Sequence, residues 1–375
     1  MAATTQPPVR FTGHEGLALR LVLSTITGRA IHVSQIRSAS LNPGLTPYEI
    51  SFLRLLEAVT NGSHLEVSYT GTILLYKPGL ITGSAAGVGA SRGVVTHELP
   101  AVHSWSQLFS APLALRLSSP PVRTAILPLF AQFGISNNVE LRVLRRSNPG
   151  PNGKGGGGEV QLVFGHQVRL PKTLHLLNPG RVKKIRGVAY STGVSGSNNA
   201  RMIDVARGVL NPFVSDTYIF SDVSSAPLVP APERNNPAAK KKIGVGFGLS
   251  LVAESSTGCL YSADVASPPS GGQPPEDIGK QCAYQLLESI ATGGCVSKVA
   301  APTMLTLMSM GSEDVGRLQV GRDVVSDETV VRLARDLSKL GAAGWGVRDA
   351  PDSDNGEIIL SVVGRGIGNI GRKIA

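Results

Sequence analysis

Residues 36–83 carry the strongest fold signal in this chain, and they read IRSASLNPGLTPYEISFLRLLEAVTNGSHLEVSYTGTILLYKPGLITG. Within this stretch, Thr46-Pro47-Tyr48-Glu49 combines a helix N-cap, a proline in the first turn and a capping-box glutamate. We therefore expect a helix over Pro47–Thr60, which carries too many apolar residues for one exposed face. Asn61-Gly62 follows and is typical of a left-handed C-terminal cap.

Further elements on both sides of this helix complete one structural unit. Apolar periodicity predicts a helix over His14–Thr27 that ends at Gly28, and then a strand over Ala30–Arg37. Two strands, His64–Thr70 and Thr72–Tyr76, follow the second helix. The beginning of the chain therefore predicts helices packed on a sheet.

Similar groups of helices and strands recur later, which suggests a threefold internal pseudo-repeat. The expected second unit has a helix over Pro121–Phe133, ended by Gly134, and strands over Val139–Leu144 and Glu159–Val163. The expected third unit has helices over Pro275–Thr292, Pro302–Met310 and Ser326–Leu340, with strands near Gly346 and over Glu357–Val363.

The segment from Arg181 to Ala266 breaks this pattern and predicts a βαβ-type insert. Its expected elements are a strand over Lys183–Tyr190, a helix over Asn198–Leu210, and strands over Tyr218–Ser221 and Ile243–Ala253. Pro230–Lys242 is expected to be a flexible loop, because its composition cannot form a core.

Residues 36–83, together with Gly13–Gly28 and Met310–Asp323, resemble the RNA 3′-terminal phosphate cyclase superfamily. Gly311-Ser312-Glu313-Asp314-Val315 resembles its eukaryotic cyclase-like branch, which takes part in ribosomal RNA processing. The resemblance implies an α/β (α+β) fold of three repeated units, each with helices on a four-stranded sheet. It also implies that residues 1–180 and 275–375 form the large domain and that 181–274 form a smaller inserted α/β domain.

The composition excludes several classes of protein. Three cysteines without a Cys-x-x-Cys pair, among 375 residues, predict neither a disulfide framework nor a zinc site. The start of the chain has no apolar signal core, and no apolar stretch reaches the roughly 20 residues of a membrane helix. We expect a protein that is not secreted, does not cross a membrane, and holds no metal or cofactor.

The net charge of +10 and the pI of about 9.7 favour a polyanionic partner. An acidic protein surface is the alternative. Aromatic residues make up only 5% of the chain, so a stacking platform for single-stranded bases is not indicated. Lys240-Lys241-Lys242 is a candidate for RNA contact or nuclear import, and a solvated loop end is the ordinary interpretation.

Two short motifs resemble catalytic patterns but stand in the wrong context. Gly366-Ile-Gly368-Asn-Ile-Gly371 matches a dinucleotide fingerprint, yet only four residues follow it, too few for a phosphate-binding helix. Gly89-Ala-Ser91-Arg-Gly93 matches a hydrolase elbow but lies in a Gly/Ala-rich loop. Neither motif predicts an active site.

The positions of the histidines bear directly on cyclase activity. Cyclases of this superfamily join AMP to a histidine near the C-terminal end of the fold, and that step requires a nitrogen nucleophile. All seven histidines of this chain lie at or before His175. The family's histidine position falls near Ser326, where Ser326 and Asp327 look like helix-capping groups instead.

Two arginines match arginines of the cyclase pocket. Arg20 and Arg37 are therefore candidates for a retained phosphate or sulfate site, although the following family arginine is Ser40 here. The Glu-Gly-Gly-Gly-Gln run of cyclases is also replaced, by Gly13-His14-Glu15-Gly16-Leu17. The alternative is that both arginines pair with local carboxylates such as Glu15 or Glu49.

A rival chemical site can be built on the last helix. Arg332, Arg335, Asp336 and Lys339 recur at spacings of three and four residues, so a carboxylate general base would stand beside cations that hold a phosphate. The ordinary interpretation is a salt-bridged helix face exposed to solvent.

The resemblance implies a nuclear, nucleolar factor of small-subunit ribosome biogenesis that lacks catalytic residues. Its implied partners are a nucleolar GTPase of the small-subunit processome and pre-rRNA or a U3-containing ribonucleoprotein. The alternative is an endoribonuclease of 18S maturation that uses Arg335, Asp336 and Lys339. An active ATP-dependent cyclase is disfavoured by the histidine positions.

Overall fold

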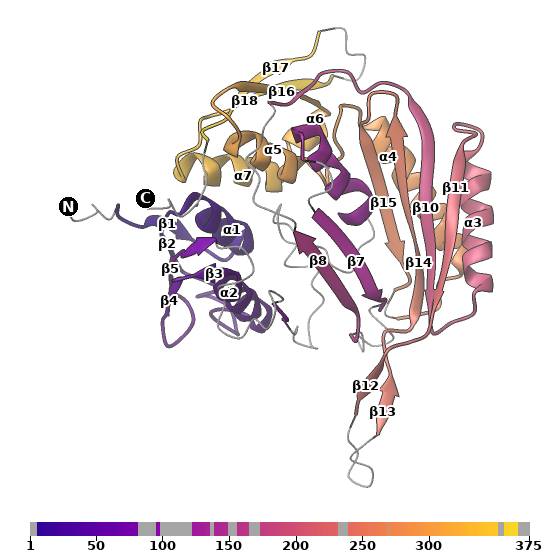
Figure 1. Ribbon diagram of the computed structural model, residues 1–375, viewed down its shortest axis with the longest axis horizontal. Helices are drawn as coiled ribbons and strands as arrows, with labels where there is room; N and C mark the ends of the chain where they lie inside the picture. Colours follow the sequence, from indigo (N-terminus) through magenta and orange to yellow (C-terminus); the bar gives the residue numbers. More distant parts are fainter. Residues whose placement is uncertain are drawn as a thin grey trace.

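The computed structural model describes residues 6–81, 95–97, 122–135, 139–148, 156–164, 173–231, 239–268, 270–351 and 356–366. Figure 1 shows how their helices and strands are arranged. The Gly89–Gly93 motif and the end of the Gly366–Gly371 motif lie outside these residues.

The first unit contains a mixed four-stranded sheet in the order β1-β2-β5-β4. Strands β1 and β2 run parallel, and the other neighbouring pairs are antiparallel. Helices α1 and α2 contribute buried side chains to the core. The elements are β1 (Val9–Thr12), α1 (Leu17–Thr27), β2 (Ile31–Ser34), α2 (Pro47–Val59), β4 (His64–Val67) and β5 (Leu74–Lys77).

The start of α2 is as predicted, but its end is not. The Glu49 carboxylate accepts a 2.8 Å hydrogen bond from the Thr46 backbone N–H, as the capping-box pattern requires. The predicted left-handed cap at Asn61-Gly62 is wrong: the helix ends at Val59, because β3 (Thr60–Asn61) is extended and pairs with β6 (Leu80–Ile81).

The first helix also starts later than predicted. Gly13 and Gly16 have φ angles of +76° and +68°, in the left-handed region, so regular helix begins only at Leu17. A Cβ on Gly16 would lie 2.9 Å from Arg332 Cδ. The glycine therefore allows the last helix to approach the start of α1.

The third unit repeats the topology of the first. Its sheet has the order β17-β18-β16-β9, in which β9 and β16 are parallel and the other pairs antiparallel. Read along the chain, both units follow strand, helix, strand, helix, strand, strand, so the predicted repeat is confirmed for these two units. The elements are β9 (His175–Leu176), α5 (Ala301–Met310), β16 (Val315–Val320), α7 (Glu328–Lys339), β17 (Gly346–Asp349) and β18 (Ile358–Val363), with the short α6 (Arg322–Val325) before α7.

The part of the second unit that the structure describes has two paired strands, β7 (Val139–Arg145) and β8 (Glu159–Phe164). The helix expected over Pro121–Phe133 is instead a π-helical turn, η3 (Val122–Ile126), followed by a 3₁₀ helix, η4 (Leu127–Phe133). Pro128 explains the change, because it has no N–H for an α-helical hydrogen bond. Gly134 ends the segment in the left-handed conformation, as predicted.

The inserted segment lies between β9 and α5. Its sheet has the order β11-β10-β14-β15, with β10 and β11 parallel around α3, as expected for a βαβ unit. Figure 1 shows this sheet at the right of the view, with α3 and α4 packed on it. The elements are β10 (Val182–Thr192), α3 (Ser197–Leu210), β11 (Thr217–Ser224), β14 (Gly246–Ser255), β15 (Leu260–Ala266) and α4 (Pro275–Ala291).

The placement of α4 corrects the sequence-based assignment to the third unit. Its Cys282 thiol donates to the Leu249 carbonyl on β14 at 3.3 Å. Its Gly279 lies so close to α3 that a Cβ would be 2.6 Å from the Met202 carbonyl oxygen. We therefore propose that the inserted domain extends to about residue 291, and not to 274.

The predicted loop Pro230–Lys242 also contains regular structure at both ends. Strand β12 (Leu228–Pro230) pairs antiparallel with β13 (Lys240–Lys242), and the two form a ribbon that belongs to none of the four-stranded sheets. Residues 232–238 lie outside the described part of the chain.

Candidate functional site

Two of the predicted site residues meet where α1 packs beside α7. The Arg20 Nε donates a 3.0 Å hydrogen bond to Asp336 Oδ2, and Nη1 donates to the carbonyl oxygens of Thr12 and Gly13 at 3.2 and 3.3 Å. Arg20 is 8% exposed and Asp336 is 2% exposed. Asp336 is therefore a buried partner of Arg20, and not part of a solvent-exposed helix face.

The aromatic ring of Phe11 lies close to two cations at the Arg20–Asp336 pair. Phe11 lies on β1, and its ring centroid is 4.7 Å from the Arg20 guanidinium carbon and 5.1 Å from Lys339 Nζ. Burial raises the pKa of Asp336, while Arg20, Lys339 and Arg332 oppose that rise through their positive charge. The carboxyl group is thus both desolvated and surrounded by cations.

The other two cations of α7 lie at the edge of this cluster. Arg332 forms ion pairs with Glu328 on its own helix and with Glu15, whose Oε2 is 3.4 Å from Arg332 Nη2. Arg335 is exposed and forms no ion pair with the residues that the structure describes. The structure therefore brings Asp336 and Lys339 together but leaves Arg335 in solvent.

Arg37 forms a separate cluster with the capping box of α2. Its guanidinium makes a bidentate contact with Glu49, at 2.7 and 2.8 Å, and also donates to the Gly44 carbonyl and the Tyr48 hydroxyl. The hydrogen bond to Glu49 raises the pKa of Arg37. Four of its five N–H groups are used within the protein.

Both candidate anion-binding arginines therefore have carboxylate partners, as the alternative interpretation expected. Glu49 is the partner that the sequence suggested for Arg37. The partner of Arg20 is Asp336 and not Glu15. Binding of an anion at either arginine stays a prediction.

Of the two capping groups expected at the N-terminus of α7, Asp327 is the N-cap and Ser326 is not, because Ser326 ends the short helix α6. Asp327 Oδ1 accepts a 2.9 Å hydrogen bond from the Thr329 backbone N–H, and Asp327 Oδ2 lies 2.8 Å from Lys298 Nζ. Burial acts to raise the pKa of Asp327, but the hydrogen bonds from Lys298 and Thr329 outweigh it and lower the pKa overall. Ser326 is exposed and donates to the Asp323 carbonyl at 3.3 Å.

A cavity of about 360 Å³ borders the site formed by Phe11, Arg20, Asp336 and Lys339. Its lining is rich in groups that attract anions, and the residues are Pro8, Arg10, Phe11, Thr12, His32, Ser34 and Lys339. Phe11 and the Thr12 and Gly13 carbonyls were not predicted as site residues. No sequence pattern marks them, because they meet Arg20 only through the packing of β1 against α1.

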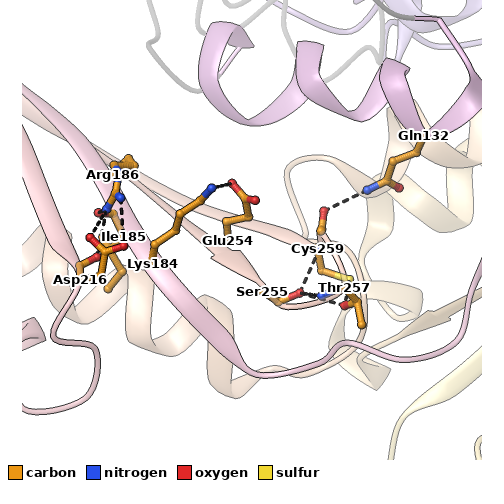
Figure 2. A network of polar contacts seen from close by, with 10 residues as sticks. Gln132, Lys184, Ile185, Arg186, Asp216, Glu254, Ser255, Thr257 and Cys259 are labelled. Carbon is orange, nitrogen blue, oxygen red and sulfur yellow. Dashed lines mark hydrogen bonds and ion pairs between the residues drawn. The ribbon is translucent and has the colours of Figure 1, made fainter.

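A second cavity of about 530 Å³ lies between η4, β9 and the turn joining β14 to β15. Gln132 Nε2 donates to the Gly258 carbonyl at 3.0 Å, and Lys184 Nζ lies 2.9 Å from Glu254 Oε2 (Figure 2). These contacts engage Gln132 Nε2, Lys184 and Glu254, whereas Gln132 Oε1 is buried and has no hydrogen-bond partner among the described residues.

The residues that the structure describes contain no group of three or more His, Cys, Asp or Glu side chains that would hold a metal ion. None of their helices has the length and apolar character needed to cross a membrane.

Comparisons with known proteins agree with this architecture. A family model described as RNA 3′-terminal phosphate cyclase (RTC), insert domain, matches residues 177–291, a segment that includes α4. The chain is 36% identical to the rRNA processing protein rcl1 of Schizosaccharomyces pombe over 386 residues, which cover 97% of this chain and 98% of that protein.

Two other relatives are similar over the same extent. The RNA 3′-terminal phosphate cyclase-like protein of Mus musculus is 36% identical over 393 residues, which cover 99% of this chain and 100% of the relative. The rRNA processing protein RCL1 of Saccharomyces cerevisiae is 34% identical over 392 residues, with 100% of both chains covered.

Proposed function

Because this chain belongs to the RNA 3′-terminal phosphate cyclase-like family, we propose that it acts in rRNA processing, as a non-catalytic factor of small-subunit ribosome biogenesis. Relatives named as rRNA processing proteins support this role over the whole chain. A nuclear and nucleolar location follows from the role. The proposed partners are a nucleolar GTPase of the small-subunit processome and pre-rRNA or a U3-containing ribonucleoprotein.

The side chains at the start of α7 support the proposal that the protein is non-catalytic. The cyclase resemblance implies that the AMP-accepting histidine would fall near Ser326, and residues 176–375 contain no histidine. A serine hydroxyl needs an adjacent base to become a nucleophile. The neighbouring Asp327 is already engaged by Thr329 and Lys298.

The role in rRNA processing is tested by depletion of the protein in cells of its source and rescue with the wild-type chain. We expect depletion to lower mature 18S rRNA and raise its precursors, and the wild-type chain to restore both. Large-subunit rRNA in the same samples is the control. Normal 18S levels after complete depletion would contradict the proposal.

An endoribonuclease is the second candidate, and one observation favours it. Burial raises the pKa of Asp336 towards the range that suits a general base, and Lys339 lies beside it. The 2% exposure of Asp336 and its hydrogen bond to Arg20 argue for a structural role instead.

The two candidates are separated by variants that leave the buried pair intact. Arg335→Ala with Lys339→Ala removes two exposed cations of the candidate nuclease, whereas Arg207→Ala with Lys280→Ala removes two exposed cations from α3 and α4. The non-catalytic proposal expects both double variants to restore 18S maturation. Loss of pre-rRNA cleavage with only the first, while the protein still enters its complex, would favour the nuclease.

A further inference from the structure

The ribbon of β12 and β13 stands apart from the rest of the fold. Its two strands pair with each other, with Leu228 opposite Lys242 and Pro230 opposite Lys240. Figure 1 shows the ribbon projecting from the body beyond the ends of β10 and β14. A narrow element that leaves the surface in this way can reach into a partner that the body itself cannot approach.

The base of the ribbon is anchored, so its direction is fixed by the body. The Ile243 N–H donates to the Pro227 carbonyl at 3.1 Å, and the Asn148 N–H donates to the Gly244 carbonyl at 2.9 Å. Gly157 packs beside Pro227 so closely that a Cβ would lie 2.7 Å from the proline Cβ. Because an isolated two-stranded hairpin is marginally stable, these contacts are needed to hold it.

The charge of the ribbon comes from three consecutive lysines. Lys240, Lys241 and Lys242 are all exposed, and alternate side chains of a strand point to opposite faces, so the ribbon carries positive charge on both sides. Within the described residues, none of the three forms an ion pair. Three arginines on β7 and just after it differ, since each has a carboxylate partner: Arg142 with Glu140, Arg145 with Glu159 and Arg146 with Asp222.

Lysines on an exposed strand also protect its edge from pairing with another chain. That role is met by a single charge on each edge and does not require three adjacent charges of one sign. Glu233 and Arg234, in the connection between the strands, cancel each other in formal charge. The net charge of the ribbon is therefore that of the three lysines. The like charges repel one another, and a polyanion relieves this repulsion.

We propose that the β12–β13 ribbon is an RNA-binding prong, whose lysines contact the phosphate backbone of the RNA on which the protein works. This inference rests on the proposed role in rRNA processing. The described residues of the ribbon are lysines, Leu228, Val229 and Pro230, without an aromatic ring for base stacking. The prong therefore positions RNA without reading its sequence.

The test is the salt dependence of RNA binding by the full-length protein. The prong variant carries Lys240→Ala, Lys241→Ala and Lys242→Ala, and the probe is a fluorescently labelled single-stranded RNA of mixed sequence. Each phosphate contact to a single strand contributes about 0.7 to the slope of log K against log salt, so the slope should fall by about 2. Over the decade from 1 M to 0.1 M salt this amounts to a loss of about 100-fold in affinity at 0.1 M.

A matched control removes the same formal charge elsewhere. Lys77→Ala, Arg207→Ala and Lys280→Ala replace three exposed cations on β5, α3 and α4. We expect this variant to bind RNA within about threefold of the wild-type chain. Both variants should unfold at the wild-type temperature, because none of the six side chains is buried. Restoring the prong with three arginines should restore the slope.

Each other outcome overturns the inference in a distinguishable way. If the wild type and the prong variant have equal slopes of log K against log salt, the ribbon lysines do not contact RNA, and the proposed function is unaffected. If the prong variant and the matched control lose the same RNA affinity, binding depends on the net charge of the protein and not on the ribbon. A prong variant that binds RNA normally but fails to enter the nucleus would identify the lysines as contacts for an import receptor. No RNA binding by the wild-type chain would overturn both the prong and direct contact with pre-rRNA.

Discussion

The Arg20–Asp336 ion pair connects the first unit to the last helix through one buried hydrogen bond. Two buried charges lose much of their hydration, and their mutual contact, the Thr12 and Gly13 carbonyls, the Phe11 ring and the neighbouring cations compensate for that loss. Removal of one partner leaves the other charge buried and unpaired. The pair is therefore a strong determinant of stability at this junction.

We predict that Asp336→Ala lowers the free energy of unfolding by about 3–5 kcal/mol, as expected when one partner of a buried pair is removed. Urea denaturation of purified protein measures this change. The control is Glu159→Ala, which breaks the exposed pair with Arg145 and should cost less than about 1 kcal/mol.

A second variant separates charge from packing at the same site. Arg20→Met combined with Asp336→Leu removes both charges and should recover most of the lost stability. If Asp336→Ala alone is as stable as the wild-type chain, the carboxylate is not a structural partner of Arg20, and a catalytic role for Asp336 gains support.

The two arginine contacts also show what a sequence can and cannot predict. Arg37 and Glu49 are 12 residues apart on either side of a recognisable turn and capping box, so their contact was among the expected alternatives. Arg20 and Asp336 are 316 residues apart. Their contact depends on how the first and third units pack, and no local pattern in the sequence encodes that packing.

At the scale of elements, the start of α7 is held by its N-cap. Asp327 accepts from the Thr329 N–H and pairs with Lys298, and both contacts are stronger with the ionised carboxylate than with the neutral acid. The helix presents Val330, Leu333 and Leu337 to the core. A weaker cap would therefore loosen the packing of the third unit.

We predict that Asp327→Ala lowers the free energy of unfolding by about 1 kcal/mol at pH 7. The pKa of Asp327 is lower in the folded protein than its ordinary value of 3.8, so its contribution is present above that value and is lost as the pH falls through the folded-state pKa. The difference between wild type and variant should shrink below pH 3.8. Asp323→Ala, at an exposed aspartate of α6, is the control, and equal effects of the two variants would contradict the assignment of the cap.

The sequence predicted α4 to within one residue at each end but assigned it to the wrong unit. Apolar periodicity identifies a helix and its buried face, but it does not say which sheet covers that face. The close approach of Gly279 to α3 is the contact that assigns α4 to the inserted domain.

Two glycine substitutions test this assignment. Gly279→Ala should lower the free energy of unfolding by about 1–3 kcal/mol, because its Cβ would overlap the Met202 carbonyl of α3. Gly208→Ala, on the exposed side of α3 with no atom within 4 Å of its Cβ, should raise it by about 0.5–1 kcal/mol. Thermal unfolding measures both, and a neutral Gly279→Ala would argue against close packing of α3 on α4.

At the scale of the whole molecule, the first and third units share one sheet topology, and the insert interrupts the third unit between β9 and α5. The repeat was predicted from recurring helices and strands, and the order of strands within each sheet comes from the structure alone. The architecture keeps the arginines that the cyclase resemblance identified, yet each is paired with a carboxylate. The cyclase resemblance places the AMP-accepting histidine near Ser326, and residues 176–375 contain no histidine that could take this role.

We propose that this protein does not transfer nucleotides. Purified full-length protein is incubated with radiolabelled ATP and a divalent cation, denatured and analysed for retained label, with an active RNA 3′-terminal phosphate cyclase as the positive control. We expect no covalent AMP on this chain under conditions in which the control enzyme is labelled. A stable adenylylated form of this protein would show instead that it has a nucleophile for AMP and retains nucleotide transfer.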